Sequence, residues 1–247
     1  MIVRTDFVDL ETPTGPMRTH VYAPVPPTGT TRYPGLLLYP EIYQQTGPIV
    51  RLSQQLAGHG YVVMAPEIYH EHEPPGTVLS YDKAGTDKGN AYKAATTLAT
   101  FDHDAAAVIR ALSAHAACNG RLGAVGVCLG GHLAFRAALQ PQVRAAACFY
   151  ATDLQGGILA GGTCVDTLAR ARDIRGELLL VWGRQDPHVP DAARAGIYQA
   201  LVAAGGSFTW HEFNAQHAFM RDEGPRYDPE AARIALGLAL ALFQRTL

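Results

Sequence analysis

Residues 126–131, Gly126-Val127-Cys128-Leu129-Gly130-Gly131, contain the pattern that decides the fold. The apolar run Arg121–Val127 precedes this stretch, and a run of helical composition, Leu129–Leu139, continues from it. A strand, a sharp turn and a helix around Gly-x-Cys-x-Gly form the context of a nucleophile elbow, with cysteine where serine is more usual. Small neighbours let strand and helix approach closely, and the helix N-terminus favours a thiolate. The alternative is a glycine-rich turn with an incidental cysteine, and the third glycine speaks against it.

Outward from this stretch, short apolar runs alternate with longer helical ones. The expected strands are Val3–Leu10, Met17–Ala23, Pro34–Pro40, Tyr61–Pro66, Arg121–Val127, Arg144–Tyr150, Glu177–Gly183 and Ser207–Phe213. The expected helices are Pro48–His59, Ala91–Ala117 with a break near Thr100, Leu129–Leu139, Pro190–Ala204 and Pro229–Leu247, and residues 67–90 are expected to form a long loop. This alternation predicts an α/β protein with a mainly parallel sheet and helices on both faces. The length of 247 residues suits one domain, 1–247.

Composition narrows the classes of function. Hydrophobic residues make up 48% and charged residues 17%, which excludes a disordered chain. The formal net charge of -2 gives no electrostatic case for a nucleic-acid or anionic membrane partner. None of the four cysteines forms a C-x-x-C pair, so no metal or redox cofactor is expected. The N-terminus shows no signal peptide and no apolar run is long enough to span a membrane, which favours a cytoplasmic protein.

The chain also supplies partners for a cysteine nucleophile in the required order of nucleophile, acid and base. Asp186 directly follows the strand Glu177–Gly183, and its alternative role is a turn or capping residue. His217 follows the strand Ser207–Phe213 and is positioned to act as the base, with Asp186 fixing its tautomer. The alternative for His217 is a loop histidine bonded to the backbone.

Other histidines compete with His217. His132 lies one turn past the elbow, where a structural role is favoured, and His188 shares the turn of Asp186. His70 and His72 alternate along one segment and suggest a metal site, but nothing in the sequence marks a third ligand. We therefore expect no metal.

Four motifs of the sequence together carry a family resemblance. Tyr39-Pro40-Glu41-Ile42-Tyr43, Gly126–Gly131, Asp186–Pro190 and His217-Ala218-Phe219-Met220-Arg221 together resemble the dienelactone hydrolase family over nearly the full chain. The resemblance implies an α/β-hydrolase fold. It also implies that Glu41 lies beside the resting thiol and is displaced when substrate binds, which helps to form the thiolate–imidazolium pair. The N–H groups of Ile42 and Leu129 would form the oxyanion hole.

The resemblance also bears on the substrate. Dienelactone enzymes of the family bind a substrate carboxylate with two arginines, of which one matches Arg221 and the other falls at Lys88. Lysine keeps the charge but loses the bidentate fork, and its alternative role is a solvated surface charge. Ala95 stands where an aromatic residue is usual. Tyr92 and Tyr150 are candidate pocket residues, and Tyr150 could equally lie in the core.

These observations predict a hydrolase of carboxymethylenebutenolidase type, which cleaves a carboxylic ester or lactone through an acyl-cysteine intermediate. Lys88 and Arg221 favour a carboxylated small molecule as substrate. One alternative keeps the fold and site but acts on general small esters or thioesters. Another is a non-catalytic binding or redox-sensing protein that uses the thiol without turnover. The expected assembly is a monomer or a small homo-oligomer.

Overall fold

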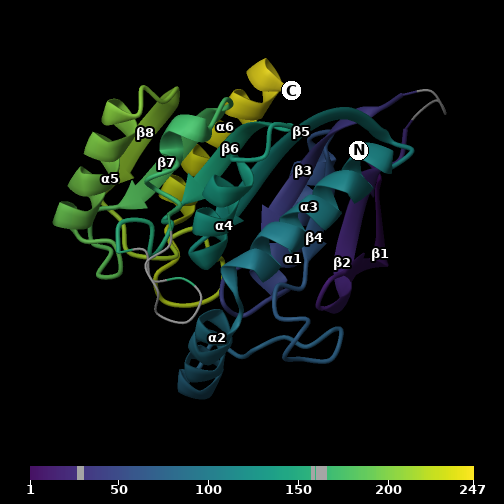
Figure 1. Cartoon of the computed structure of the whole chain (residues 1–247), viewed down its shortest axis with the longest axis horizontal. Coiled ribbons are helices and arrows are strands. Elements are labelled where there is room, and N and C mark those ends of the chain that lie inside the picture. The colour runs from purple at the N-terminus through teal and green to yellow at the C-terminus, as the bar shows by residue number, and fades with distance from the viewer. Residues whose placement is uncertain (27–30, 157–158, 160–165) are drawn as a thin grey trace.

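The computed structural model describes residues 1–26, 31–156, 159 and 166–247 and contains one eight-stranded sheet (Figure 1). The strands are β1 (Val3–Thr12), β2 (Gly15–Pro24), β3 (Tyr33–Tyr39), β4 (Val62–Pro66), β5 (Cys118–Val127), β6 (Val143–Phe149), β7 (Glu177–Gly183) and β8 (Phe208–Phe213). Their spatial order is β1-β2-β4-β3-β5-β6-β7-β8. β2 pairs antiparallel with both β1 and β4, whereas the six strands β3 to β8 run parallel to one another. The predicted mainly parallel sheet is confirmed.

Helices cover both faces of the sheet. They are α1 (Gly47–Gly58), α3 (Leu98–Ala114), α4 (Leu129–Ala137), α5 (Asp191–Ala203) and α6 (Pro229–Thr246), whereas α2 (Lys83–Ala95) lies beyond the end of the sheet (Figure 1). One core cluster joins the sheet to α3, α4 and α5, and a second joins it to α1 and α6. In β3, Leu37 enters the first cluster while Leu36 and Leu38 enter the second, because successive side chains point to opposite faces. Burial on both sides explains why these strands read as continuous apolar runs.

The prediction of a loop over residues 67–90 is wrong for its last part, where α2 begins. Asp82 caps this helix, since its side chain accepts a hydrogen bond of 2.7 Å from the Gly85 N–H. The buried residues of α2 are the glycines Gly85 and Gly89, so the helix has no apolar stripe for a sequence pattern to reveal. The break before α3 lies at residues 96–97 rather than at Thr100, because Thr97 caps α3.

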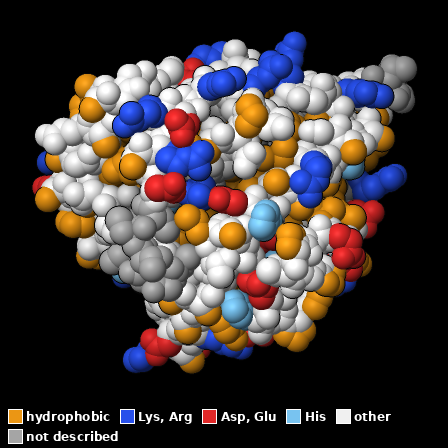
Figure 2. Space-filling model, in the orientation of Figure 1, with side chains coloured by type: hydrophobic (Ala, Val, Ile, Leu, Met, Phe, Trp, Pro, Cys, Tyr) orange, Lys and Arg blue, Asp and Glu red, His pale blue; other side chains and the backbone are white. Residues whose placement is uncertain are grey.

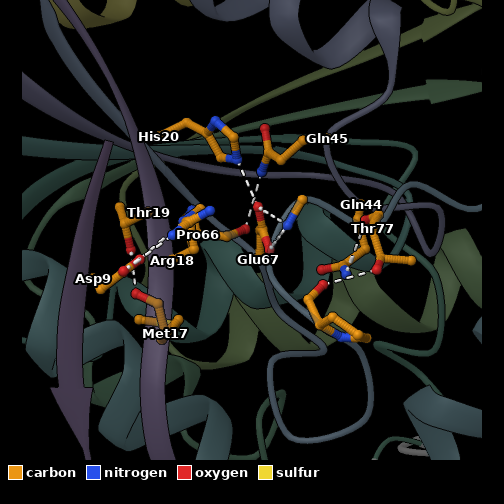
Figure 3. A network of polar contacts seen from close by, with 12 residues as sticks. Asp9, Met17, Arg18, Thr19, His20, Gln44, Gln45, Pro66, Glu67 and Thr77 are labelled. Carbon is orange, nitrogen blue, oxygen red and sulfur yellow. Dashed lines mark hydrogen bonds and ion pairs between the residues drawn. The ribbon is translucent and has the colours of Figure 1, made fainter. Parts of the chain in front are cut away.

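The segment that follows β4 is tied down by buried polar groups (Figure 3). The Glu67 carboxylate is 2% exposed and accepts hydrogen bonds of 3.1 and 2.9 Å from the Gly76 N–H. The Nε2 atom of His20, on β2, lies 2.7 Å from the same carboxylate. The Gln45 side chain donates to the Pro66 carbonyl at 3.0 Å. These contacts fix the long connection between β4 and α2 against the β1–β2 hairpin and the end of β3.

No helix in the described part of the chain has the length and apolar content needed to cross a bilayer. On the face shown in Figure 2, hydrophobic side chains are scattered among polar and charged ones of both signs. Scattered apolar side chains are normal on protein surfaces.

Candidate active site

The Cys128 elbow lies between β5 and α4, at the edge where the parallel strands end. Cys128 has φ 59° and ψ −123°, a conformation that costs energy in a residue with a side chain. The residues two positions before and after Cys128 are glycine because neighbouring backbone segments touch there. A Cβ atom at Gly126 would lie 1.9 Å from the Gly130 carbonyl oxygen, and one at Gly130 would lie 2.3 Å from that of Tyr39. The close packing therefore fixes the partly exposed Cys128 side chain at the start of α4.

Cys128 lies in one cluster with His217 and Asp186, which follow β8 and β7. His217 Nδ1 donates to Asp186 Oδ2 at 2.6 Å, and the Cys128 side chain lies close enough to the His217 ring to raise its pKa. The His188 N–H donates to the other Asp186 oxygen at 2.8 Å. Asp186 and His217 are 3% and 6% exposed. The structure thus brings together the three residues that the sequence predicted as nucleophile, acid and base.

The electrostatics of this cluster favour an imidazolium. Burial disfavours the charged ring of His217, but the charge of Cys128 and the hydrogen bond to Asp186 raise its pKa to about 10. Burial favours neutral Asp186, yet the hydrogen bond and charge of His217 hold the pKa of this carboxyl below its usual range. A negative sulfur beside a charged ring is the arrangement that thiol nucleophiles need.

Glu41 follows β3 and enters the same cluster. It is 2% exposed. The Tyr81 hydroxyl donates to Glu41 Oε2 at 3.2 Å, and Arg221 Nη1 lies 3.8 Å from the same oxygen. Burial raises the pKa of Glu41, against the opposing effects of Arg221, His217 and Tyr81. A buried carboxylate with a raised pKa is ready to accept a proton.

Two backbone donors lie where the end of β3 meets the start of α4. They are the N–H groups of Ile42 and Leu129, and the close approach of Gly130 to Tyr39 brings these segments together. Neither N–H is bonded to a protein acceptor among the residues that the structure describes. Free N–H groups beside a nucleophile can hold a developing oxyanion.

Tyr81 is a site residue that sequence reasoning missed. The Cζ atom of Arg221 lies 4.2 Å from the centroid of its ring, and its hydroxyl contacts Glu41. Its neighbours Ser80 and Asp82 carry no motif, so no local signal could have found it. Tyr81 reaches the site only because the connection between β4 and α2 passes beside Glu41.

Lys88 and Tyr92, both expected in the pocket, belong to another cluster. Lys88 forms an ion pair with Glu73, and the Tyr92 hydroxyl donates to the same carboxylate at 2.5 Å. Tyr92 also stacks on His72, with ring centroids 4.9 Å apart. Among the described residues, no hydrogen bond, ion pair or ring contact joins either side chain to Cys128. The two side chains therefore tie α2 to residues 72–73.

Tyr150 and His188 contact the base from two sides. The Tyr150 ring is 1% exposed and lies 5.1 Å from the His217 ring, edge to face. The His188 ring lies 4.7 Å from His217, also edge to face, and partial desolvation of the ring and the His217 charge lower the pKa of His188. The buried Tyr150 ring therefore packs against the base, whereas the His188 side chain keeps contact with solvent.

The remaining histidines have structural partners. His132 is fully buried between the Thr152 carbonyl and the Thr167 hydroxyl, and burial lowers its pKa to about 4. His70 contacts Asp104 at 3.1 Å, whereas His72 contacts Thr96 at 3.0 Å. Across the described residues, no three side chains gather in a way that could hold a metal ion.

This combination of a parallel sheet, an elbow after β5 and partners after β7 and β8 defines an α/β-hydrolase. The chain belongs to the dienelactone hydrolase family, whose model matches residues 17–247. The protein is therefore a hydrolase of this family.

Individual relatives agree with this assignment. A protein of Saccharomyces cerevisiae named as a candidate carboxymethylenebutenolidase is 40% identical over 100% of this chain and 93% of its own length. The carboxymethylenebutenolidase of Pseudomonas sp. strain P51 is 26% identical over 87% of this chain and 85% of its own. A crystal structure of a candidate dienelactone hydrolase from Klebsiella pneumoniae has a TM-score of 0.86 at 23% identity, covering 99% of this chain and 100% of that one.

Proposed function

We propose that the protein hydrolyses a carboxylic ester or lactone through an acyl-cysteine intermediate. The observation that carries this proposal is the hydrogen bond from His217 to Asp186, with Cys128 close enough to the His217 ring to raise its pKa. The thiolate of Cys128 attacks the carbonyl carbon, and the N–H groups of Leu129 and Ile42 stabilise the oxyanion. His217 gives its proton to the departing alkoxide or enolate, and a thioester remains. Water, deprotonated by His217, then releases the acid and regenerates the thiol.

The proposed substrate class is a carboxylated lactone or activated ester. The names of the relatives support a carboxymethylenebutenolidase type of reaction, and Arg221 supplies a cation at the edge of the site. A thiolate is also a good leaving group, so an acyl-cysteine enzyme suits substrates whose alcohols or enols depart easily. In this role the substrate displaces Glu41, which takes the proton of the Cys128 thiol and passes it to His217, so that the thiolate–imidazolium pair forms before the attack.

The test is hydrolysis of p-nitrophenyl acetate and cis-dienelactone before and after iodoacetamide, repeated with Cys128→Ala. Cys118→Ala is a matched control, because this thiol is buried and lies at the start of β5. We expect Cys128→Ala and iodoacetamide to abolish both activities and Cys118→Ala to retain them. Turnover that survives in Cys128→Ala would refute the nucleophile. Alkylation of Cys128 without turnover on either substrate would favour a thiol-based sensor instead.

A further inference from the structure

His188 shares a carboxylate with the catalytic base. Asp186 Oδ1 accepts the His188 N–H at 2.8 Å, while Asp186 Oδ2 accepts the Nδ1–H of His217 at 2.6 Å. A side-chain oxygen that accepts the N–H two residues further on closes an Asx turn, and this turn fixes the backbone of His188. The same carboxylate thus places both histidines, one through its backbone and the other through its ring.

The His188 ring lies directly against the His217 ring. Their centroids are 4.7 Å apart and their planes meet at 69°. The Tyr150 ring also contacts His217, at 5.1 Å, and burial raises the pKa of this phenol well above its usual range. Tyr150 therefore stays neutral, so of these two neighbours His188 is the one that can change its charge near neutral pH.

The His188 side chain is open to solvent and free to titrate. The residue is exposed. Within the described parts of the chain, neither ring nitrogen of His188 takes part in a hydrogen bond or an ion pair. The buried His132, by contrast, has both ring nitrogens engaged. His188 can therefore take up a proton without breaking any contact of its own nitrogens.

Charged groups face His188 from three parts of the chain. They are Asp186 on its own turn, His217 and Arg226 between β8 and α6, and Asp153 after β6. Asp153 is itself paired with Lys93 of α2 at 2.9 Å. Partial desolvation and then the charge of His217 have the largest effects, and they lower the pKa of His188. His188 is therefore neutral at pH 7 and gains its charge below the ordinary histidine value of about 6.5.

The coupling between the two rings acts in both directions. Because the charge of His217 lowers the pKa of His188, a charge on His188 lowers the pKa of His217 by the same amount. A charged His188 also draws on the Asp186 carboxylate, which otherwise stabilises the charged ring of His217. Both effects disfavour the imidazolium, the partner that the Cys128 thiolate needs.

We propose that His188 is a positioning residue for the catalytic base: its neutral ring packs the charged His217 ring against Asp186, and a positive charge on His188 switches the thiolate–imidazolium pair off in weakly acidic solution. The proposal rests on the acyl transfer proposed above, to which it adds a dependence on pH. When His188 takes up a proton from solvent, the proton on His217 Nε2 returns to Cys128 Sγ. The site then holds a thiol and a neutral imidazole, which do not attack an ester.

The test measures kcat/KM for p-nitrophenyl acetate at pH 5 and pH 7.5, read at the isosbestic wavelength of p-nitrophenol. His188→Phe keeps a neutral ring against His217 but cannot take up a proton. Two unit charges in ring contact interact by on the order of one pH unit. The quotient of kcat/KM at pH 5 to that at pH 7.5 should therefore be about tenfold higher in His188→Phe than in the parent. A merely structural role would lower both values together and leave the quotient unchanged.

A second variant supplies the opposite charge state. His188→Lys is charged at both pH values, so its kcat/KM at pH 7.5 should be about tenfold below that of His188→Phe. His59→Phe, at an exposed histidine that ends α1, is the control and should keep the quotient of the parent. Equal quotients in the parent and His188→Phe would overturn the proposal, as would equal kcat/KM of the Phe and Lys variants at pH 7.5.

Alkylation of Cys128 by iodoacetamide separates this proposal from the proposed reaction, because it reports the thiolate without any turnover. The rate is followed by mass spectrometry of the peptide that contains Cys128. We expect the quotient of the rates at pH 5 and pH 7.5 to be about tenfold higher in His188→Phe than in the parent. This result supports the role of His188 even if no ester is hydrolysed, in which case only the reaction is refuted. The same quotient in both proteins refutes that role whatever the turnover.

Discussion

The Asp186→Asn substitution tests the role of the acid most directly. Asp186 accepts hydrogen bonds from His217 Nδ1 at 2.6 Å and from the His188 N–H at 2.8 Å. An asparagine of the same shape can keep only one of them. If its amide oxygen faces the His188 N–H, its NH2 group faces His217 and forces the ring into the other tautomer. The proton then sits on Nε2, which can no longer accept the proton of the thiol.

The expected loss is large in kcat and small in KM. A wrong tautomer in a comparable triad lowers kcat about 10⁴-fold, which corresponds to about 5 kcal/mol of transition-state stabilisation. KM should change little, because Asp186 is 3% exposed and lies behind His217. Steady-state kinetics with p-nitrophenyl acetate at pH 7 measures both, with thermal unfolding as a check of folding. Asp191→Asn is the matched control, since the Asp191 side chain is 80% exposed at the start of α5. A folded Asp186→Asn variant with kcat within about tenfold of the parent would refute the triad geometry, given the size of the expected loss.

Gly130→Ala places a Cβ atom 2.3 Å from the Tyr39 carbonyl and should lower the thermal midpoint by roughly 4–8 °C, whereas Gly237→Ala, with open space around it, should not. His132 has a folded pKa of about 4, below that of the unfolded ring, so it stabilises the fold above about pH 6.5. Denaturant unfolding should lose about 3 kcal/mol from this group as the pH falls from 6.5 to 4, and less in His132→Asn. Glu41→Gln should lower kcat about 10²-fold, because the thiol proton then has no carboxylate to carry it to His217; an unchanged kcat would remove Glu41 from the mechanism.

The catalytic chain could be predicted from sequence because its parts have local signals. Cys128, Asp186 and His217 each lie in the turn or loop that follows a predicted strand, and the edge where parallel strands end brings such positions together. Glu41 was expected only from the family resemblance, since a single glutamate after a strand is otherwise a surface residue. The structure buries it 3.8 Å from Arg221, which is distant in sequence.

The region between β4 and α3 resisted prediction for a physical reason. Its positions depend on polar contacts and close backbone approach rather than on a hydrophobic pattern. A Cβ atom at Gly89 would lie 2.5 Å from the Ile42 carbonyl, so α2 packs on the segment after β3 through backbone atoms. Glu67 holds the connection between β4 and α2 in place by accepting a hydrogen bond from the Gly76 N–H. Neither contact leaves a periodicity of apolar residues in the sequence.

These two regions divide the site into parts with different tolerance to change. The catalytic residues and the proposed oxyanion donors lie beside the ends of β3, β5, β7 and β8, where close backbone packing at Gly126, Gly130 and Gly183 holds the neighbouring segments together. Tyr81, by contrast, lies on the connection between β4 and α2, which is held by a few buried polar contacts such as that of Glu67. Substitutions in residues 67–97 can therefore alter which ester or lactone is bound without moving Cys128 or His217. Relatives with the same elbow but a different connection between β4 and α2 should share the acyl-transfer chemistry and differ in the charge of the substrate that they prefer.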